Sequence, residues 1–181
     1  MRVYFDTEFT GLHAKTTLIS IGLISDCGKT FYAELNDFDK SQLDNWLKEN
    51  VISNLSMQTS RAGITRFYKD KKETVFFGDT DQLKEALTEW MSQFGYVEIW
   101  SDCLSYDWVL FNNIFGHAFS IPKNVYYIPF DICTLFKIKG IDPDISREEF
   151  AEIKKEDIQK HNALYDAVVI KKCFEKLDKL K

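Results

Sequence analysis

The chain has 181 residues, of which 45% are hydrophobic, 28% are charged and 15% are aromatic. It carries 23 Lys and Arg against 28 Asp and Glu, which gives a formal net charge of −5. This length suits one domain, and we expect residues 1–181 to form a single one. The aromatic content excludes a disordered chain, and the acidic balance argues against broad binding to nucleic acid or to an anionic membrane.

The order of the predicted elements indicates the fold class. Strands rich in β-branched and aromatic residues are predicted over residues 2–6, 17–25, 30–35, 96–100 and 125–129. Helices are predicted over residues 41–52, 80–94, 105–115 and 162–180, with shorter ones after Asp131 and Ser146. In the first helix, Trp46 falls on the same apolar spacing as Leu47 and Val51. Three successive strands followed by alternating helices and strands are typical of an α/β domain with a mixed sheet.

The cysteines and the apolar runs indicate the cellular setting. The four cysteines are separated by 30 or more residues and form no C-x-x-C pair, which argues against a zinc ribbon. We find no signal peptide, and no apolar run approaches the roughly 18 residues of a membrane span. We therefore expect a cytoplasmic protein that does not associate with membranes.

Two acidic segments are candidate sites. In D-T-E-F-T-G-L, Asp6 and Glu8 stand two residues apart on a predicted strand and therefore point to the same face. Paired carboxylates in this position suit hard divalent cations such as Mg²⁺. In S-Y-D-W-V-L-F, Asp107 follows a predicted strand in the first turn of a helix. Its negative charge either interacts favourably with the helix dipole there, or its side chain reaches the end of the first strand.

A third candidate is H-N-A-L-Y-D, which contains His161 and Asp166. Five helical residues turn through about 500°, so these side chains would lie about 140° apart on one helix. We therefore expect His161 in the approach to the last helix and Asp166 within it.

Taken together, these three motifs resemble those of the DEDDh 3′→5′ exonucleases, which include proofreading domains, RNase T and oligoribonuclease. The resemblance extends from residue 6 to residue 166, and the short D-T-E-F opening is similar to a small bacterial and phage branch of exoribonuclease-like proteins. It implies a ribonuclease H-like fold, a mixed sheet flanked by helices. One departure is Cys103, where many members have Asn four residues before the second-motif Asp.

The resemblance also implies a catalytic mechanism. Four carboxylates would hold two Mg²⁺ or Mn²⁺ ions about 4 Å apart, while His161 would act as the general base that deprotonates the attacking water. The four implied ligands are Asp6, Glu8, Asp107 and Asp166. The residues Phe9, Thr10, Gly11 and Leu12 would contact the terminal nucleotide. Hydrolysis at the 3′ end would release nucleoside 5′-monophosphates.

Basic residues outside these motifs are candidates for steering the substrate. The segment 61–72, to which we assign no secondary structure, contains five basic residues against Asp70 and carries a local charge of +4. We expect either that Arg61 and Arg66 contact phosphate or that the segment is simply a solvated face.

Several alternatives stay open at this point. The substrate is expected to be RNA or a short single-stranded overhang, with single-stranded DNA as the alternative. A catalytically silent member of the fold would bind nucleic acid without cleaving it. A haloacid dehalogenase phosphatase would require Asp in place of Glu8 and would give His161 no role. The resemblance is compatible with a homodimer, for which no residue marks an interface.

Overall fold

The computed structural model describes residues 1–56, 64–68, 72–154 and 160–180, with the backbone alone for residues 64–68. Its strands are β1 (Arg2–Phe9), β2 (Leu18–Ser25), β3 (Thr30–Leu35), β4 (Ile64–Tyr68), β5 (Glu73–Gly78), β6 (Glu98–Ser101) and β7 (Phe130–Asp131). Its α-helices are α1 (Asn45–Asn50), α2 (Thr80–Ser92), α3 (Ser105–Ile114), α4 (Ile132–Ile138), α5 (Arg147–Phe150) and α6 (Ala163–Lys179). Three 3-10 turns are η1 (Lys40–Gln42), η2 (Ile52–Asn54) and η3 (Ala118–Ser120).

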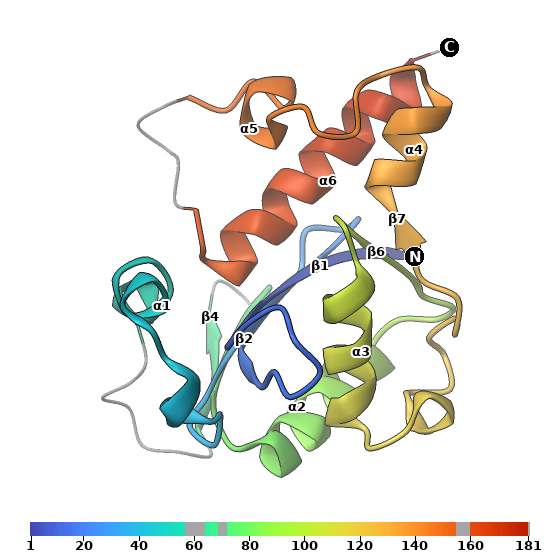
Figure 1. Ribbon diagram of the computed structural model, residues 1–181. Coiled ribbons are helices and arrows are strands. Elements are labelled where there is room, and N and C mark those ends of the chain that lie inside the picture. Colours follow the sequence, from blue (N-terminus) through green and yellow to red (C-terminus); the bar gives the residue numbers. More distant parts are fainter. Residues whose placement is uncertain (57–63, 69–71, 155–159, 181) are drawn as a thin grey trace.

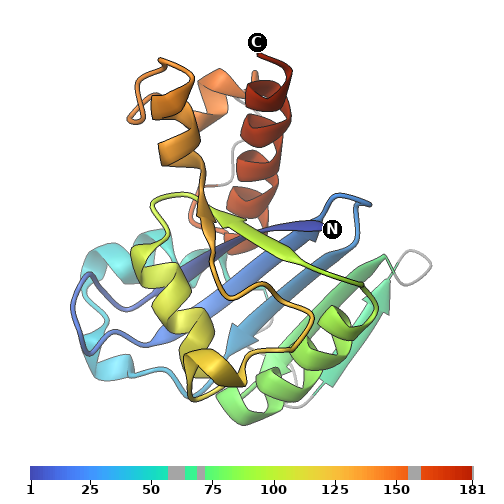
Figure 2. The same ribbon diagram turned by 90° about the vertical axis from the view of Figure 1, so that its right-hand side faces the viewer.

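The described strands form one mixed sheet in the order β4-β5-β3-β2-β1-β6-β7. The first three strands of the chain pair antiparallel, whereas β6 joins β1 in parallel and β7 joins β6 in parallel. Helices cover both faces of this sheet (Figures 1 and 2). The predicted α/β class, with a mixed sheet flanked by helices, is therefore confirmed. Within the described ranges, no helix is both long enough and apolar enough to cross a lipid bilayer.

Opposite faces of β1 have different roles because side chains alternate along a strand. On one face Phe5 is fully buried and packs its ring 5.7 Å from that of Phe111 in α3. Tyr4 belongs to the cluster on the other face, where α4 and α6 lie. Asp6 and Glu8 follow Tyr4 at even spacing, so they share the face covered by α6. Figure 2 shows the sheet separating α6 from α2 and α3.

Several predicted elements differ from the structure. The strands β4 and β5 were not predicted, and β4 lies within the basic segment. The strand expected over 125–129 is displaced: Val125 forms only an isolated bridge with Val97, and pairing with β6 resumes at Phe130. Pro129 has no N–H to donate, which agrees with this interruption.

The helix predicted over 41–52 is split into η1, α1 and η2. Asp44 explains the break, because its side chain accepts a hydrogen bond of 2.7 Å from the Leu47 N–H and caps the start of α1. Leu47 and Val51 are buried as their spacing predicts, but Trp46 is 52% exposed. The apolar spacing was therefore a wrong guide for Trp46.

The N-terminus of α6 approaches the sheet at Gly22 of β2, the residue paired with Asp6. A Cβ atom at this position would overlap the backbone of Ala163 and Leu164. Only glycine therefore allows the first turn of α6 to lie directly on the strand beside β1. This close approach brings Asp166, four residues after the N-cap Asn162, to the acidic end of β1.

Replacing Gly22 with alanine should displace the start of α6 and destabilise the fold. Overpacking of this kind costs about 1–3 kcal/mol, and we expect the free energy of unfolding in urea to fall by that amount. The Asp166 carboxylate should also move away from the end of β1, because it moves with the helix. Gly95→Ala is the matched control, since a Cβ at Gly95 meets no atom within 4 Å. Equal stability of the two variants would contradict the packing argument.

Candidate active site

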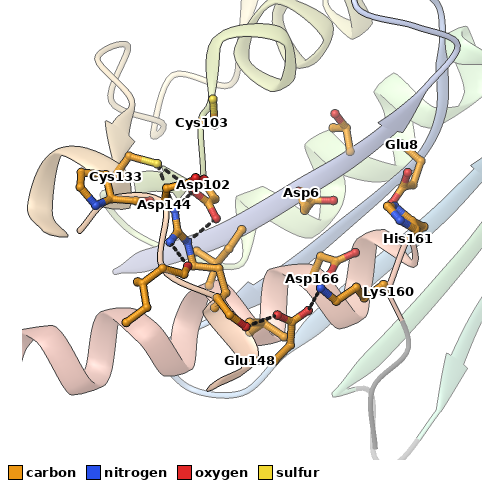
Figure 3. Close-up of a pocket in the computed structure, with 17 residues that line it drawn as sticks. Asp6, Glu8, Asp102, Cys103, Cys133, Asp144, Glu148, Lys160, His161 and Asp166 are labelled. Atoms are coloured by element: carbon orange, nitrogen blue, oxygen red, sulfur yellow. Dashed lines mark hydrogen bonds and ion pairs between the residues drawn. The ribbon is translucent and has the colours of Figure 1, made fainter. Parts of the chain in front are cut away.

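The C-terminal half of β1 and the first turn of α6 bring three carboxylates together. Asp6, Glu8 and Asp166 each present an oxygen atom, and these atoms lie within 4.8 Å of one another. They line a cavity of about 560 Å³ that also contains His161 (Figure 3). The cavity continues past Asp102 and Arg147 toward the loop before α5.

Asp107 reaches the same end of β1 from the other side. It stands in the first turn of α3 and is buried, as an acid at a helix N-terminus can be. Its Oδ1 accepts hydrogen bonds from the Thr7 N–H at 3.0 Å and from the Thr7 hydroxyl at 2.5 Å. Thr7 lies between Asp6 and Glu8, so Asp107 is held against the strand that carries them. Both roles expected for Asp107 are therefore compatible with its position.

His161 lies just before α6, as the spacing of the third motif predicts. Its backbone φ is 61°, a left-handed conformation that is uncommon for a residue with a side chain. This turn directs the backbone amides of His161 and Asn162 to the Asp166 carboxylate. The imidazole packs against the ring of Trp46 in α1 in a T-shaped arrangement, with 4.9 Å between the ring centroids.

The crowding of carboxylates dominates the electrostatics of the site. Desolvation and the neighbouring acids raise the pKa of Glu8 to about 8, and desolvation with the charge of Glu148 raises the pKa of Asp166 to about 7. Desolvation raises the pKa of Asp107 to about 6, despite the hydrogen bonds from Thr7. The pKa of Asp6 rises well above its usual value for the same reasons, desolvation first and then Asp107. A cation placed among these groups would relieve their repulsion.

His161 shifts in the opposite direction. Partial burial and the neighbouring Lys160 charge lower the pKa of its imidazole below 6.5. The ring is therefore neutral at pH 7 and has a nitrogen lone pair able to accept a proton.

The residues expected to contact a nucleotide line a second cavity of about 350 Å³, which shares Glu8 with the first. Phe9 stacks on Tyr106 with 5.5 Å between ring centroids, and Leu12 is 76% exposed. Thr10 is buried, and its hydroxyl donates to Gln42 and accepts from the Thr17 N–H, so this side chain holds its own loop in place. Gly11 has a φ of 155° at the edge of the same cavity.

The two arginines expected to meet phosphate fall outside the part of the chain whose side chains the structure describes. Arg61 lies outside the described residues. Arg66 lies in β4, at the edge of the sheet farthest from β7, and only its backbone is described. Their contact with substrate remains a prediction.

Several residues in the site were not singled out from the sequence. Trp46 lines the second cavity together with Leu12, and Glu148 and Lys160 line the first. Arg147 Nε lies 2.7 Å from Asp102 Oδ2, which ties α5 to the end of β6. The helical periodicity gave no indication that Trp46 is exposed. The capping pattern at Ser146 predicted the short helix α5 correctly. Nothing in the sequence indicated that α5 faces the carboxylates.

Strand β1 of the mixed sheet ends beside three clustered carboxylates, with Asp107 held against the same strand and His161 in the same cavity. The model of a family described as "3′-5′ exoribonuclease Rv2179c-like domain" matches residues 1–177, and the chain belongs to this family. The assignment to the 3′-5′ exonucleases is therefore confirmed, and the protein is an exonuclease enzyme.

Two curated relatives and one solved structure are similar to the chain. The 3′-5′ exoribonucleases Rv2179c and MT2234.1, from the H37Rv and CDC 1551 strains of Mycobacterium tuberculosis, are each 25% identical to the chain over 142 residues. The match covers 77% of this chain and 76% of each relative. Among solved structures, the Pan2 catalytic unit of Neurospora crassa (protease and nuclease domain) is similar with a TM-score of 0.49 and 17% identity, over 98% of this chain and 27% of that one.

The raised carboxylate pKa values predict how the stability of the metal-free protein depends on pH. Unfolded Asp and Glu titrate near pH 4, whereas Asp107, Asp166 and Glu8 titrate at about 6, 7 and 8 in the folded protein. The folded state therefore binds more protons between about pH 4 and 8, and the free energy of unfolding should fall as pH rises through this range. The lowered pKa of His161 makes the free energy of unfolding rise with pH, but this single group is outweighed by four carboxylates.

Urea denaturation in EDTA at pH 5.5 and pH 8 measures this slope. Saturating Mn²⁺ should raise the stability most at pH 8, because cations replace the protons that the carboxylates have lost. Asp6→Asn should flatten the slope in EDTA and abolish most of the gain from Mn²⁺. Higher stability at pH 8 than at pH 5.5 in EDTA would contradict the account of the site.

Proposed function

We propose that this exonuclease removes nucleotides from the 3′ ends of RNA or short single-stranded overhangs and releases nucleoside 5′-monophosphates. The observation that carries the proposal is the convergence of Asp6, Glu8 and Asp166, with Asp107 against the same strand and His161 in the same cavity. Membership of the exoribonuclease family supports RNA as the substrate. The names of the mycobacterial relatives support the same choice.

The donor set suits hard divalent cations. All four acidic side chains offer carboxylate oxygens, the ligands that Mg²⁺ and Mn²⁺ prefer. Asp6, Glu8, Asp107 and Asp166 would hold two such ions. When bound, a pair of ions stabilises the negative charge that develops on the attacking and leaving oxygens of a phosphodiester.

His161 supplies the proton acceptor. Its neutral imidazole lies in the cavity beside the carboxylates, where it would take the proton from the water that attacks phosphorus. The left-handed turn keeps it outside α6, so it faces the cavity from a different direction than Asp166. The imidazole then passes this proton to solvent, and the 3′-oxygen that leaves phosphorus takes a proton from solvent as the phosphodiester bond breaks.

The second cavity suits the base of the terminal nucleotide. Leu12 and Trp46 are both exposed apolar side chains on its wall, and nucleobases stack on such groups. Because this cavity shares Glu8 with the first, a base held there leaves its phosphate near the carboxylates. Phe9 and Gly11 complete the same wall and shape the space for a single, unpaired strand end.

Substitutions in the acidic cluster and at His161 test the mechanism. His161→Ala should lower kcat by a factor of about 10²–10⁴ while leaving the fold intact, because the general base is lost. Asp107→Ala should abolish nucleotide release, and EDTA should do the same to the wild type until Mn²⁺ is added. The measurement is the rate of nucleoside monophosphate release in Mn²⁺. Asp81→Asn, an exposed acid of α2, is the control.

Matched 5′-labelled single strands of RNA and DNA test the substrate. The RNA should shorten one nucleotide at a time from its 3′ end, and the DNA should shorten more slowly. Faster removal from DNA would make the enzyme an exodeoxyribonuclease. Normal activity in Asp107→Ala would refute the assignment of this carboxylate as a metal ligand, and binding of RNA without cleavage would indicate a silent member of the fold.

A further inference from the structure

The turn that carries His161 is held by two contacts that involve none of the four proposed metal ligands. Lys160 Nζ lies 3.1 Å from Glu148 Oε1 of α5 on one side (Figure 3). On the other side, the side-chain amide of Asn54 in η2 donates to the Lys160 carbonyl at 3.1 Å and reaches the His161 carbonyl at 3.5 Å. These two contacts come from segments far apart in the sequence.

The conformation of His161 explains why such support is needed. A φ of 61° brings Cβ close to the backbone carbonyl, and a residue other than glycine leaves this region unless its surroundings hold it there. The same turn directs the amides of His161 and Asn162 to Asp166. Relaxation of the turn would therefore move the imidazole and shift two backbone amides relative to the Asp166 carboxylate, a proposed metal ligand.

The segment from α1 to η2 contacts this turn at two residues, Trp46 and Asn54. Trp46 in α1 meets the imidazole in a T-shaped arrangement, and Asn54 at the end of η2 meets the backbone that carries it. The 3-10 turn η2 follows α1 directly, so both contacts belong to one continuous element. Asn54 itself is exposed and lines neither cavity. Its amide also donates to the Asn50 carbonyl at 2.5 Å, which orients it toward the turn.

We propose that Asn54 is a positioning residue for the exonuclease reaction. Its amide holds the left-handed turn at His161 so that the imidazole remains in the cavity, and it contacts neither the carboxylates nor the second cavity. This inference rests on the proposed role of His161 as the general base. Glu148 contributes to the same turn, but it lines the cavity and acts on Asp166, so its replacement would also alter the charge at the carboxylates.

The test replaces Asn54 with leucine, which has a similar size and no hydrogen-bond donor. We expect kcat for single-stranded RNA in Mn²⁺ to fall about tenfold, since small displacements of a catalytic group have effects of this order. KM should change less than about twofold, because no contact to substrate is lost. Ser53→Ala is the matched control: within the described residues, the Ser53 hydroxyl donates to the Glu49 carbonyl of its own segment, and the activity of this variant should equal that of the wild type.

A double-mutant cycle with His161→Ala separates positioning from a general structural role. If Asn54 acts through the imidazole, Asn54→Leu should cause no further loss in the His161→Ala background. An equal loss in both backgrounds, an effect on KM alone, or full activity of Asn54→Leu would each overturn the inference. The single variant His161→Ala tests the underlying mechanism separately. Full activity of this variant would mean that His161 is not the general base.

Discussion

The close packing of α6 on β2 at Gly22 is the constraint on which the site depends. Asp6 and Glu8 belong to β1 and need only the alternation of a strand to face the same side. Asp166 and His161 come from a segment about 160 residues later, and they reach that side only because α6 begins in direct contact with the sheet. The packing that builds one half of the core therefore also assembles the carboxylates. On the proposed mechanism, stability and catalysis share this contact, so neither can be changed there alone.

Bringing acidic groups together costs electrostatic free energy, and this cost favours the binding of protons or divalent cations. The carboxylates raise one another's pKa values, and their repulsion is relieved by protons at low pH or by divalent cations at neutral pH. The formal net charge of −5 would repel a polyanion such as RNA, but two divalent ions would reduce it to about −1. On the proposed mechanism, an acidic nuclease with this site is suited to a single strand end held at the metals. It is poorly suited to broad contact along a duplex.

The sequence predicted the parts of this protein that depend on local patterns. The α/β class, the long helices and the placement of His161 before α6 followed from periodicity, capping residues and motif spacing. The strand β5 was missed because a short segment between charged residues gains its structure by pairing with β3. Trp46 and Asn54 were missed for a related reason. Their roles are set by contacts with His161 more than 100 residues away, and helical spacing carries no information about such contacts.

Electron paramagnetic resonance of the Mn²⁺-loaded protein tests most directly the claim that three distant segments form one two-metal site. Two Mn²⁺ ions about 4 Å apart are close enough for their spins to couple. The wild type should therefore bind two ions and give a spin-coupled spectrum that is lost in Asp6→Asn. A six-line spectrum of isolated Mn²⁺ at saturation, unchanged by Asp6→Asn, would contradict the account.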